Sequence, residues 1–570
     1  VLALGMLSAL RKTLAMVSQR EGRALALYQV PEGDDPTYDM ISRADTVGVF
    51  QIESRAQMSM LPRLRPDCYY DLVIEVALVR PGPIQGGAVH PYLDRRQGRV
   101  PVSYPREELK VALERTLGVP IFQEQCMQIA MVAAGFSAGE ADGLRRAMAA
   151  WKRKGGLEKY HDRLVGGMVA RGYEQDFAEG VFKQIQGFSD YGFPESHAAS
   201  FALLVYASAW LKCHYPAEFL VGLLNSQPMG FYSPAQLVQD ARRHQVTVWP
   251  VDVQHSGVDS ALDGPAPAPL KAGGPPPAVR LGLRLVAGLS AAAAQRIAQA
   301  RTAGPFLDAQ DLARRAGLEQ ADLRHLAAAD ALRSLAGHRR QQMWEAAGLR
   351  RAPALLRGAP VDEAPLALPA APEGEEIVAD YQSTGLTLRR HPLELLRPQL
   401  QRRRLLTAEA LRACPQGRLV RHAGIVTMRQ RPPTASGTLF ITLEDETGMV
   451  QAICWPRVYE RFRAVLVSAR LLGLAGTWQR VGPPLQMSRT SCVTSIWRPS
   501  GPPQVASMMS MRRGCTGLSP TQAMWTLKVG GATSASTKFC GWQVQITVSF
   551  LSRWARVSLK VAPFARTSQG

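Results

Sequence analysis

The chain has 570 residues, of which 46% are hydrophobic, and it carries a formal net charge of +20. This length predicts three to five domains with packed cores. The charge favours polyanionic partners such as nucleic acid, with a basic protein that binds no nucleic acid as the alternative.

The eight cysteines form no C-x-x-C motif, which argues against a zinc ribbon or a thioredoxin-like site and indicates free thiols in a reducing compartment. The most apolar run, around 198–211, is too short to span a bilayer, so we expect a cytoplasmic protein without a membrane partner.

Helical periodicity dominates the first half of the chain. The first twenty residues repeat their apolar side chains at helical spacing, and residues 45–250 predict one large, mostly helical domain with short Gly/Pro breaks. A stretch rich in Pro, Gly and Ala over 261–280 predicts a linker, as does a Pro/Ala/Glu stretch over 351–376. Between these two linkers, residues 281–350 are rich in Ala, Leu and Arg and again predict helices.

The character of the sequence changes at 417–482. Runs of β-branched and aromatic residues, such as TLFITLEDETGMVQAICWP, are separated there by Gly turns and predict a small antiparallel barrel. The predicted fold class is therefore a multidomain protein, mainly α, followed by a small β-barrel.

The last part of the chain has an unusual composition. Residues 483–570 contain neither Asp nor Glu, although about a tenth of residues in ordinary proteins are acidic. The same segment contains ten Lys and Arg residues, and it shows no sustained period of 3.6 or 2. We predict an unstructured tail, and out-of-frame translation is the hypothesis that explains its composition. Because the tail carries half of the net charge, the argument from charge for nucleic acid is weaker than the total suggests.

One predicted helix concentrates positive charge. Ser137 and Glu140 form a capping box that begins this helix. Five cations within ten residues can clamp phosphates, and a solvated basic face is an equal alternative. The cations are Arg145, Arg146, Lys152, Arg153 and Lys154.

A second, apolar helix has polar groups at both ends, within YGFPESHAASFALLVYASAWLKCHYPAEF (191–219). Ser196 is the expected N-cap. His197 then lies in the first turn, where free amides and the helix dipole favour an anion such as phosphate, with ordinary capping as the alternative. Lys212 and His214 lie in the last turn, where cations suit the dipole.

Two helical hairpins follow the first linker. VAGLSAAAAQRIAQAR (286–301) places a turn at Gly288 before a helix capped by Ser290, and LRHLAAADALRSLAGHRRQQMW (323–344) predicts a second hairpin. The pair resembles a helix-hairpin-helix module, whose turn amides bind the DNA backbone without reading its sequence. A generic helical bundle is the alternative.

Several longer segments closely resemble the bacterial C-family DNA polymerases, the group of the polymerase III alpha subunit. The resemblance extends in order over residues 1–482. One further segment, IQGGAVHPYLDRR (84–96), resembles the error-prone branch of the family more than the replicative one. The segments that carry the family resemblance are FQIESRAQMSMLPRLRPDCYYDLVIEVALVRPGP (50–83), IFQEQCMQIA (121–130), LRRAM (144–148), the apolar helix over 191–219 and HPLE (391–394).

The resemblance implies a DNA-directed DNA polymerase that adds deoxynucleotides to a primer 3′ end during damage-induced translesion synthesis and DNA repair. The implied partners are a DNA primer-template, deoxynucleoside triphosphates, and accessory mutagenesis proteins or the sliding clamp. The implied domains are the end of the palm (1–44), fingers (45–250), a linker (251–280), a helix-hairpin-helix domain (281–350), a second linker (351–416), an OB-fold barrel (417–482) and the tail (483–570).

The resemblance also implies roles for individual residues. Arg145, Arg146 and His197 would lie near the triphosphate of the incoming nucleotide, with Tyr191 close by. DNA contacts are implied for Lys152, Arg153, Lys154, Gly288 and Ser290.

The sequence departs from the family pattern at its start. Family members hold two Mg²⁺ ions with three palm aspartates, the last of which directly precedes a segment that resembles VLALGML, and this sequence begins at that segment. We therefore expect the chain to hold no catalytic aspartate, to bind no metal and not to polymerise by itself, since in-line phosphoryl transfer depends on the metals. A non-catalytic DNA-binding remnant is the alternative function.

Overall fold

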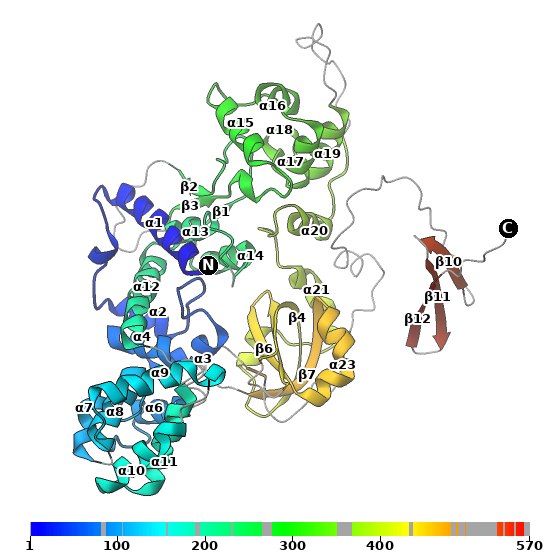
Figure 1. Ribbon diagram of the computed structural model, residues 1–570. Helices are drawn as coiled ribbons and strands as arrows, with labels where there is room; N and C mark the ends of the chain where they lie inside the picture. The colour runs from blue at the N-terminus through cyan, green and yellow to red at the C-terminus, as the bar shows by residue number, and fades with distance from the viewer. Residues whose placement is uncertain are drawn as a thin grey trace, which may run out of the picture. The chain divides into compact units, whose positions relative to one another are not determined.

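The computed structural model divides the chain into two compact units, Val1–Ala506 and Ser507–Gly570. Figure 1 labels the helices and strands. The structure describes residues 2–80, 87–104, 106–154, 158–188, 194–229, 232–264, 276–349, 367–432, 437–479, 486–487, 496–497, 533–539, 542–551 and 554–563.

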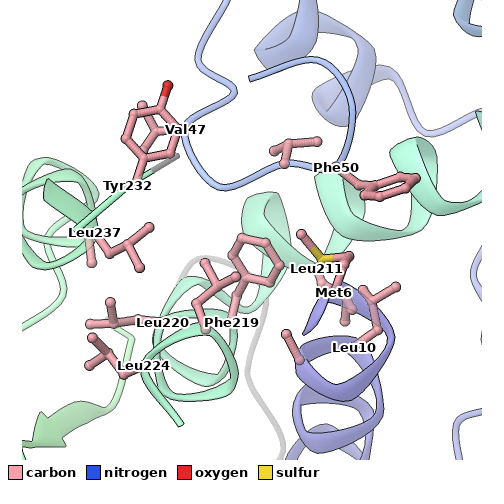
Figure 2. Packing of buried hydrophobic residues seen from close by; sticks show 14 of the residues in the cluster. Met6, Leu10, Val47, Phe50, Leu211, Phe219, Leu220, Leu224, Tyr232 and Leu237 are labelled. Carbon is pink, nitrogen blue, oxygen red and sulfur yellow. The ribbon is translucent and has the colours of Figure 1, made fainter. Parts of the chain in front are cut away.

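The helices at the start of the chain pack into one large core with later helices. The predicted N-terminal helix is confirmed as α1 (Leu2–Glu21). Ser54 and Gln57 form a capping box that begins α3, and a buried ion pair between Arg20 and Glu218 joins α1 to α13. Figure 2 shows part of this core. Besides helices within 291–348 that are described below, the core includes α2 (Asp35–Ser42), α3 (Arg55–Leu64), α4 (Tyr69–Leu78), α6 (Val89–Arg96), α12 (Glu195–His214), α13 (Pro216–Leu224) and α14 (Pro234–Arg243).

A second, smaller core lies within the range predicted as a single fingers domain. Its buried residues include Leu144 and Met148 of α9 and Phe182 of α11. The region 45–250 therefore holds two hydrophobic cores rather than one. The helices of the smaller core are α7 (Lys110–Leu113), α8 (Gln123–Ala134), α9 (Ala138–Lys154), α10 (His161–Ala170) and α11 (Gln175–Phe188).

The next part of the chain combines a small sheet with five helices. Strand β3 (Ala278–Arg280) pairs in parallel with β1 (Val248–Trp249) and antiparallel with β2 (Ala261–Asp263). The range predicted as a linker over 251–280 thus contains two strands in its described part. The helices are α15 (Ala291–Arg301), α16 (Ala309–Ala316), α17 (Gln320–Ala328), α18 (Arg333–Ala336) and α19 (Arg339–Gly348).

The second predicted linker, 351–416, also contains folded elements. Its described part forms α20 (Glu373–Ser383), α21 (Pro392–Arg402) and α22 (Ala408–Arg412). Arg339 of α19 forms ion pairs with Glu376 (2.5 Å) and Asp380, so α20 is fixed to the preceding helices. The sequence missed these helices because Pro and Ala dominate the composition just before them.

The predicted small β domain is confirmed at 419–479. Strand β4 (Leu419–Gln430) pairs antiparallel with both β5 (Leu439–Asp445) and β7 (Leu471–Gln479), which curls the sheet. Strand β6 (Gly448–Cys454) pairs with β5, and α23 (Pro456–Ser468) packs against the sheet through Val458 and Leu466. Two short strands, β8 (Gln486–Met487) and β9 (Ile496–Trp497), pair with β7.

The predicted absence of structure over 483–570 differs from the structure. Besides β8 and β9, this range forms an antiparallel sheet of β10 (Thr533–Phe539), β11 (Trp542–Leu551) and β12 (Trp554–Pro563). Residues 542–551, WQVQITVSFL, alternate between apolar and polar side chains along most of β11, which is the period of a strand. The alternation is confined to this short stretch, so the longer segment has no sustained period.

Within the residues that the structure describes, no helix combines the length and apolar character that crossing a membrane requires.

Helices α1 and α13 approach each other closely at Gly222. A Cβ atom at this position would lie 2.2 Å from Thr13 Oγ1 and 2.9 Å from the carbonyl oxygen of Ala9. We expect Gly222→Ala to lower the free energy of unfolding by about 1–3 kcal/mol, since the helices must separate. Thermal and chemical unfolding of the two proteins measure this change.

Gly180→Ala is the matched control, because Gly180 lies in helix α11 with nothing within 4 Å of the added methyl group. Alanine has the higher helix propensity, so this variant should be as stable as the parent or slightly more so. Equal destabilisation by both substitutions would contradict the close approach of α1 and α13.

Candidate functional site

Helix α12 begins two residues earlier than the sequence predicts. Its N-cap is Pro194 and its first residue is Glu195, so Ser196 lies inside the helix and does not cap it. The amide of Glu195 donates instead to Glu124 Oε2 of α8 at 3.0 Å. A carboxylate from a distant helix thus takes one of the free amides that were expected to attract an anion.

The Glu195 side chain is also held from two sides. Its carboxylate accepts a hydrogen bond from Tyr70 Oη at 2.8 Å and lies 3.4 Å from Arg115 Nη1. The Arg115 guanidinium stacks over the Tyr70 ring at 4.3 Å. The start of α12 is therefore fixed to α4 and to the smaller core.

His197 is exposed in the first turn of α12. Its ring lies 4.2 Å from the ring of Phe201, and Phe201 meets Phe50 edge-on with a centroid distance of 5.3 Å. The amide of Phe50 donates to Ser208 Oγ of the same helix at 3.1 Å. These contacts connect His197 through aromatic rings to the segment 45–53.

That segment lines a cavity of about 290 Å³. Arg80 Nη2 donates to Gln51 Oε1 at 2.5 Å on its wall. Burial raises the pKa of Glu53, which also lines the cavity, to about 8. The cavity has the size and mixed apolar and polar lining of a small-molecule site. Its other lining residues include Met6, Gln57, Val79, Met229 and Tyr232.

A buried cation holds the segment 45–53 in place. Lys212 Nζ lies 3.0 Å from Asp45 Oδ1 and 2.8 Å from Asp240 Oδ2, and it donates to the carbonyl of Val47 at 3.1 Å. The Lys212 side chain is only 3% exposed. It therefore forms a buried ion pair rather than the simple interaction with the helix dipole that its position predicts.

His244 of α14 completes this network. Its Nε2 lies 2.6 Å from Asp45 Oδ2, and this hydrogen bond raises the pKa of His244 above its ordinary value despite burial. Burial by itself raises the pKa of Asp45, but the hydrogen bond from His244 and the charge of Lys212 outweigh it and hold that pKa well below the ordinary value.

The predicted basic helix is α9, and its capping box is confirmed. The amide of Ser137 donates to Glu140 Oε2 at 2.7 Å, and the amide of Glu140 donates to Ser137 Oγ at 3.2 Å. Arg145 and Arg146 both bind the carboxylate of Asp142, with 2.8 Å from Arg145 Nη2 to Asp142 Oδ1. The structure brings these two arginines together on one acidic partner that the sequence argument did not include.

Arg145 and Arg146 belong to the smaller core through α9, whereas His197 belongs to the large core through α12. A common site for the three residues stays a prediction. Tyr191 lies outside the described residues. The helix α9 includes Lys152, Arg153 and Lys154, whose side chains also lie outside the described part of the chain.

Gly288 and Ser290 form the turn that precedes α15. Gly288 has a φ of +87°, and a Cβ atom there would lie 2.7 Å from the ring of His325 on α17. Ser290 Oγ accepts the amide of Ala293 at 3.1 Å and caps the helix as predicted. The amide of Ala287 donates to the carbonyl of Ser383 on α20 at 2.7 Å, so this amide is not available to a ligand.

Two parts of the chain are similar to known protein domains. Residues 6–172 match the family described as bacterial DNA polymerase III alpha subunit finger domain. This part of the chain is therefore similar to the finger domain of the DNA polymerase III alpha subunit. Residues 245–342 match a helix-hairpin-helix motif, so the predicted module is confirmed.

Relatives of this chain carry a common name. A protein of Bordetella bronchiseptica named error-prone DNA polymerase is 62% identical over 483 residues, which are 84% of this chain and 45% of that protein. Proteins of the same name from Alkalilimnicola ehrlichii and Methylococcus capsulatus are 59% and 57% identical, over 85% and 84% of this chain and 46% and 47% of their own lengths. The family resemblance seen in the sequence is confirmed, and the chain spans about half the length of the curated relatives it matches.

Sequence reasoning missed most of the groups around the cavity. Glu53 and Arg80 lie within the segment that carries the family resemblance, but neither has a local pattern that indicates a cavity. Lys212 and Asp45 are 167 positions apart, and Glu195 and Glu124 are 71 apart. The one available signal was the unusual lysine at the end of an otherwise apolar helix.

The pair of His244 and Asp45 predicts a pH dependence of stability. A histidine with a raised pKa in the folded chain contributes stability that is complete below its unfolded value of 6.5 and is lost as the pH rises through the folded pKa. The contribution of Asp45 is present above its unfolded value of 3.8 and is lost as the pH falls through the lowered folded pKa. Both contributions are therefore present between pH 3.8 and pH 6.5.

We expect His244→Gln to destabilise the chain more at about pH 5.5 than at about pH 8.5, because glutamine cannot carry the charge that histidine gains. Denaturant unfolding at the two pH values measures the difference, and substitution of the exposed His90 by Gln is the control. A destabilisation that grows with pH would show that the histidine charge does not stabilise this network.

Proposed function

We propose that this chain is the fingers, helix-hairpin-helix and OB-barrel part of an error-prone DNA-directed DNA polymerase. In this function a deoxynucleotide is added to a primer 3′ end during damage-induced translesion synthesis and repair. The observation that carries the proposal is the match of residues 6–172 to the finger domain, together with relatives named error-prone DNA polymerase at 57–62% identity. The proposed partners are a primer-template, deoxynucleoside triphosphates, and accessory mutagenesis proteins or the sliding clamp.

The strand order supports an OB barrel for the β domain. Strands follow the order β4-β5-β6-β8-β7, and β4 also pairs with β7, so the pairing returns to its first strand. Strands β6 and β8 are parallel, and α23 lies between β6 and β7 in the chain. OB folds are five-stranded Greek-key barrels that bind oligonucleotides, and we assign this domain to the template strand.

The triphosphate site is proposed around α9 and the start of α12. Arg145 and Arg146 share Asp142, so the three side chains keep one net positive charge for a phosphate. Guanidinium groups form strong, often bidentate, charge-assisted hydrogen bonds with phosphate oxygens. His197 is exposed and adds a further nitrogen donor.

Magnesium is the metal that this chemistry requires, and it stabilises the charge that develops on the transferring phosphoryl group. The acidic clusters of the described residues do not fit it. Asp45 and Asp240 enclose the ammonium group of Lys212, and Asp71 is 2.6 Å from Arg96 Nη2. A Mg²⁺ site needs open carboxylate oxygens, so we assign to this chain the handling of nucleotide and DNA and propose that it does not polymerise alone.

The triphosphate site is tested with a fluorescent deoxynucleoside triphosphate and the purified chain. We expect the double variant Arg145→Ala/Arg146→Ala to weaken binding roughly tenfold or more, since it removes hydrogen bonds to a charged group. Asp142→Asn is the matched variant: it removes the competing charge and should leave affinity equal or higher. An equal loss in both variants would mean that the arginines only stabilise α9.

A non-catalytic DNA-binding remnant is the second candidate, and it predicts DNA binding without triphosphate binding. Anisotropy with primer-templates of unrelated sequence should show equal affinities that fall as salt increases. Gly288→Ala should weaken this binding, because the added methyl group meets His325 at the hairpin. Gly304→Ala is the control, since Gly304 also has a positive φ but nothing within 4 Å. Sequence-dependent binding, or equal effects of the two substitutions, would contradict the hairpin's role.

A further inference from the structure

Three side chains with different donor atoms meet where α12 ends and α2 begins. They are Asp34, Cys213 and His214, and one carboxylate oxygen, the sulfur and one ring nitrogen all lie within 4.8 Å of one another. All three residues are half-buried. A carboxylate, a thiolate and an imidazole are together the ligand types that proteins use for Zn²⁺.

The three side chains are held before any ion arrives. Asp34 caps α2: its Oδ2 accepts the amide of Thr37 at 3.0 Å and the Thr37 hydroxyl at 2.6 Å. The amide of Asp34 donates to Tyr206 Oη of α12 at 3.0 Å, and that hydroxyl donates to the carbonyl of Pro31 at 2.7 Å. The turn before α2 is thereby fixed against the helix that carries Cys213 and His214.

The pair of His214 and Asp34 can exchange its shared proton for a metal ion. His214 Nε2 lies 2.8 Å from Asp34 Oδ2, so an ion bound by both side chains takes the place of the proton between these two atoms. Among the described residues, Asp34 Oδ1 takes part in no hydrogen bond. The site also lies at the C-terminal end of α12, where the helix dipole favours a cation.

Two other clusters of possible ligands in the described chain are already paired with a lysine or an arginine. The cluster of Asp45, Asp240 and His244 already surrounds the Lys212 ammonium. The cluster of Asp67, Cys68 and Asp71 is neutralised by Arg96, whose Nη2 is 3.2 Å and 2.6 Å from the two carboxylates. At Asp34 the ion-pair partner is a histidine, which can exchange a proton for a metal.

We propose that Asp34, Cys213 and His214 form a binding site for a transition-metal ion of the Zn²⁺ class, with water in the fourth position. The thiol of Cys213 binds as thiolate and releases its proton to solvent when the ion binds. Burial raises the pKa of the Cys213 thiol above its ordinary value, although Thr37 and Arg43 partly oppose this rise, so the thiolate forms with the ion rather than before it. The bound ion joins the first turn of α2 to the last turn of α12, so it stabilises the fold next to the segment 45–53.

The proposal is tested by titrating the full chain, freed of metal, with Co²⁺. A thiolate ligand gives cobalt a charge-transfer absorption band in the near ultraviolet, and we expect this band to form and to disappear when Zn²⁺ is added. Cys213→Ser should abolish the band, and Cys68→Ser is the matched control that should keep it. No band in the parent chain, or a band that survives Cys213→Ser, would overturn the proposal.

The carboxylate is tested separately with Asp34→Asn. Asparagine is an equally good N-cap, so α2 should remain folded while the affinity for Zn²⁺ falls by about tenfold or more. Added Zn²⁺ should raise the thermal midpoint of the parent chain and leave that of Cys213→Ser unchanged. A midpoint that rises equally in both proteins would contradict the site, and since no DNA or nucleotide is present, the result is independent of the proposed polymerase function.

Discussion

The buried ammonium of Lys212 is the interaction on which the candidate site depends. An amine that is 3% exposed needs counter-charges within contact distance, and the fold supplies Asp45 from the segment before α3 and Asp240 from α14. Removing either carboxylate would leave a buried charge without full compensation. Because the same ammonium also binds the carbonyl of Val47, the position of the segment that lines the cavity follows from one ion-pair network.

Helix α12 contacts the segment 45–53 at several points along its length. Lys212 anchors the segment 45–53 at one end, Ser208 binds the amide of Phe50 one turn earlier, and Phe201 touches the Phe50 ring further along. His197 lies at the opposite end, on the ring of Phe201. A helix that must satisfy all these contacts has little freedom to rotate, so its exposed first turn keeps a defined direction relative to the cavity. This explains why an apolar helix carries polar groups at both ends.

The sequence predicted the features whose signals are local. Helix α1, the capping box of Ser137 and Glu140, and the cap at Ser290 depend on residues within a few positions of one another. The family resemblance supplied the fingers and the helix-hairpin-helix module. What the sequence could not show were partners that meet only after folding, such as Glu124 at the start of α12 or Asp34 beside His214. These pairs lie far apart in the chain and have no period.

The segment after the helix-hairpin-helix module shows how composition can mislead. Its Pro- and Ala-rich start predicts a flexible tether, but Arg389 lies 3.0 Å from both Asp330 and Glu376, and 3.3 Å from Asp380. These pairs, together with those of Arg339, fix α20 and the residues after it to the module before it. The following helix, α21, packs Leu393 and Leu400 against Ala423 of the β domain. The connection between the hairpins and the β domain is therefore a folded element, which limits how far the two surfaces that we propose to bind DNA can separate.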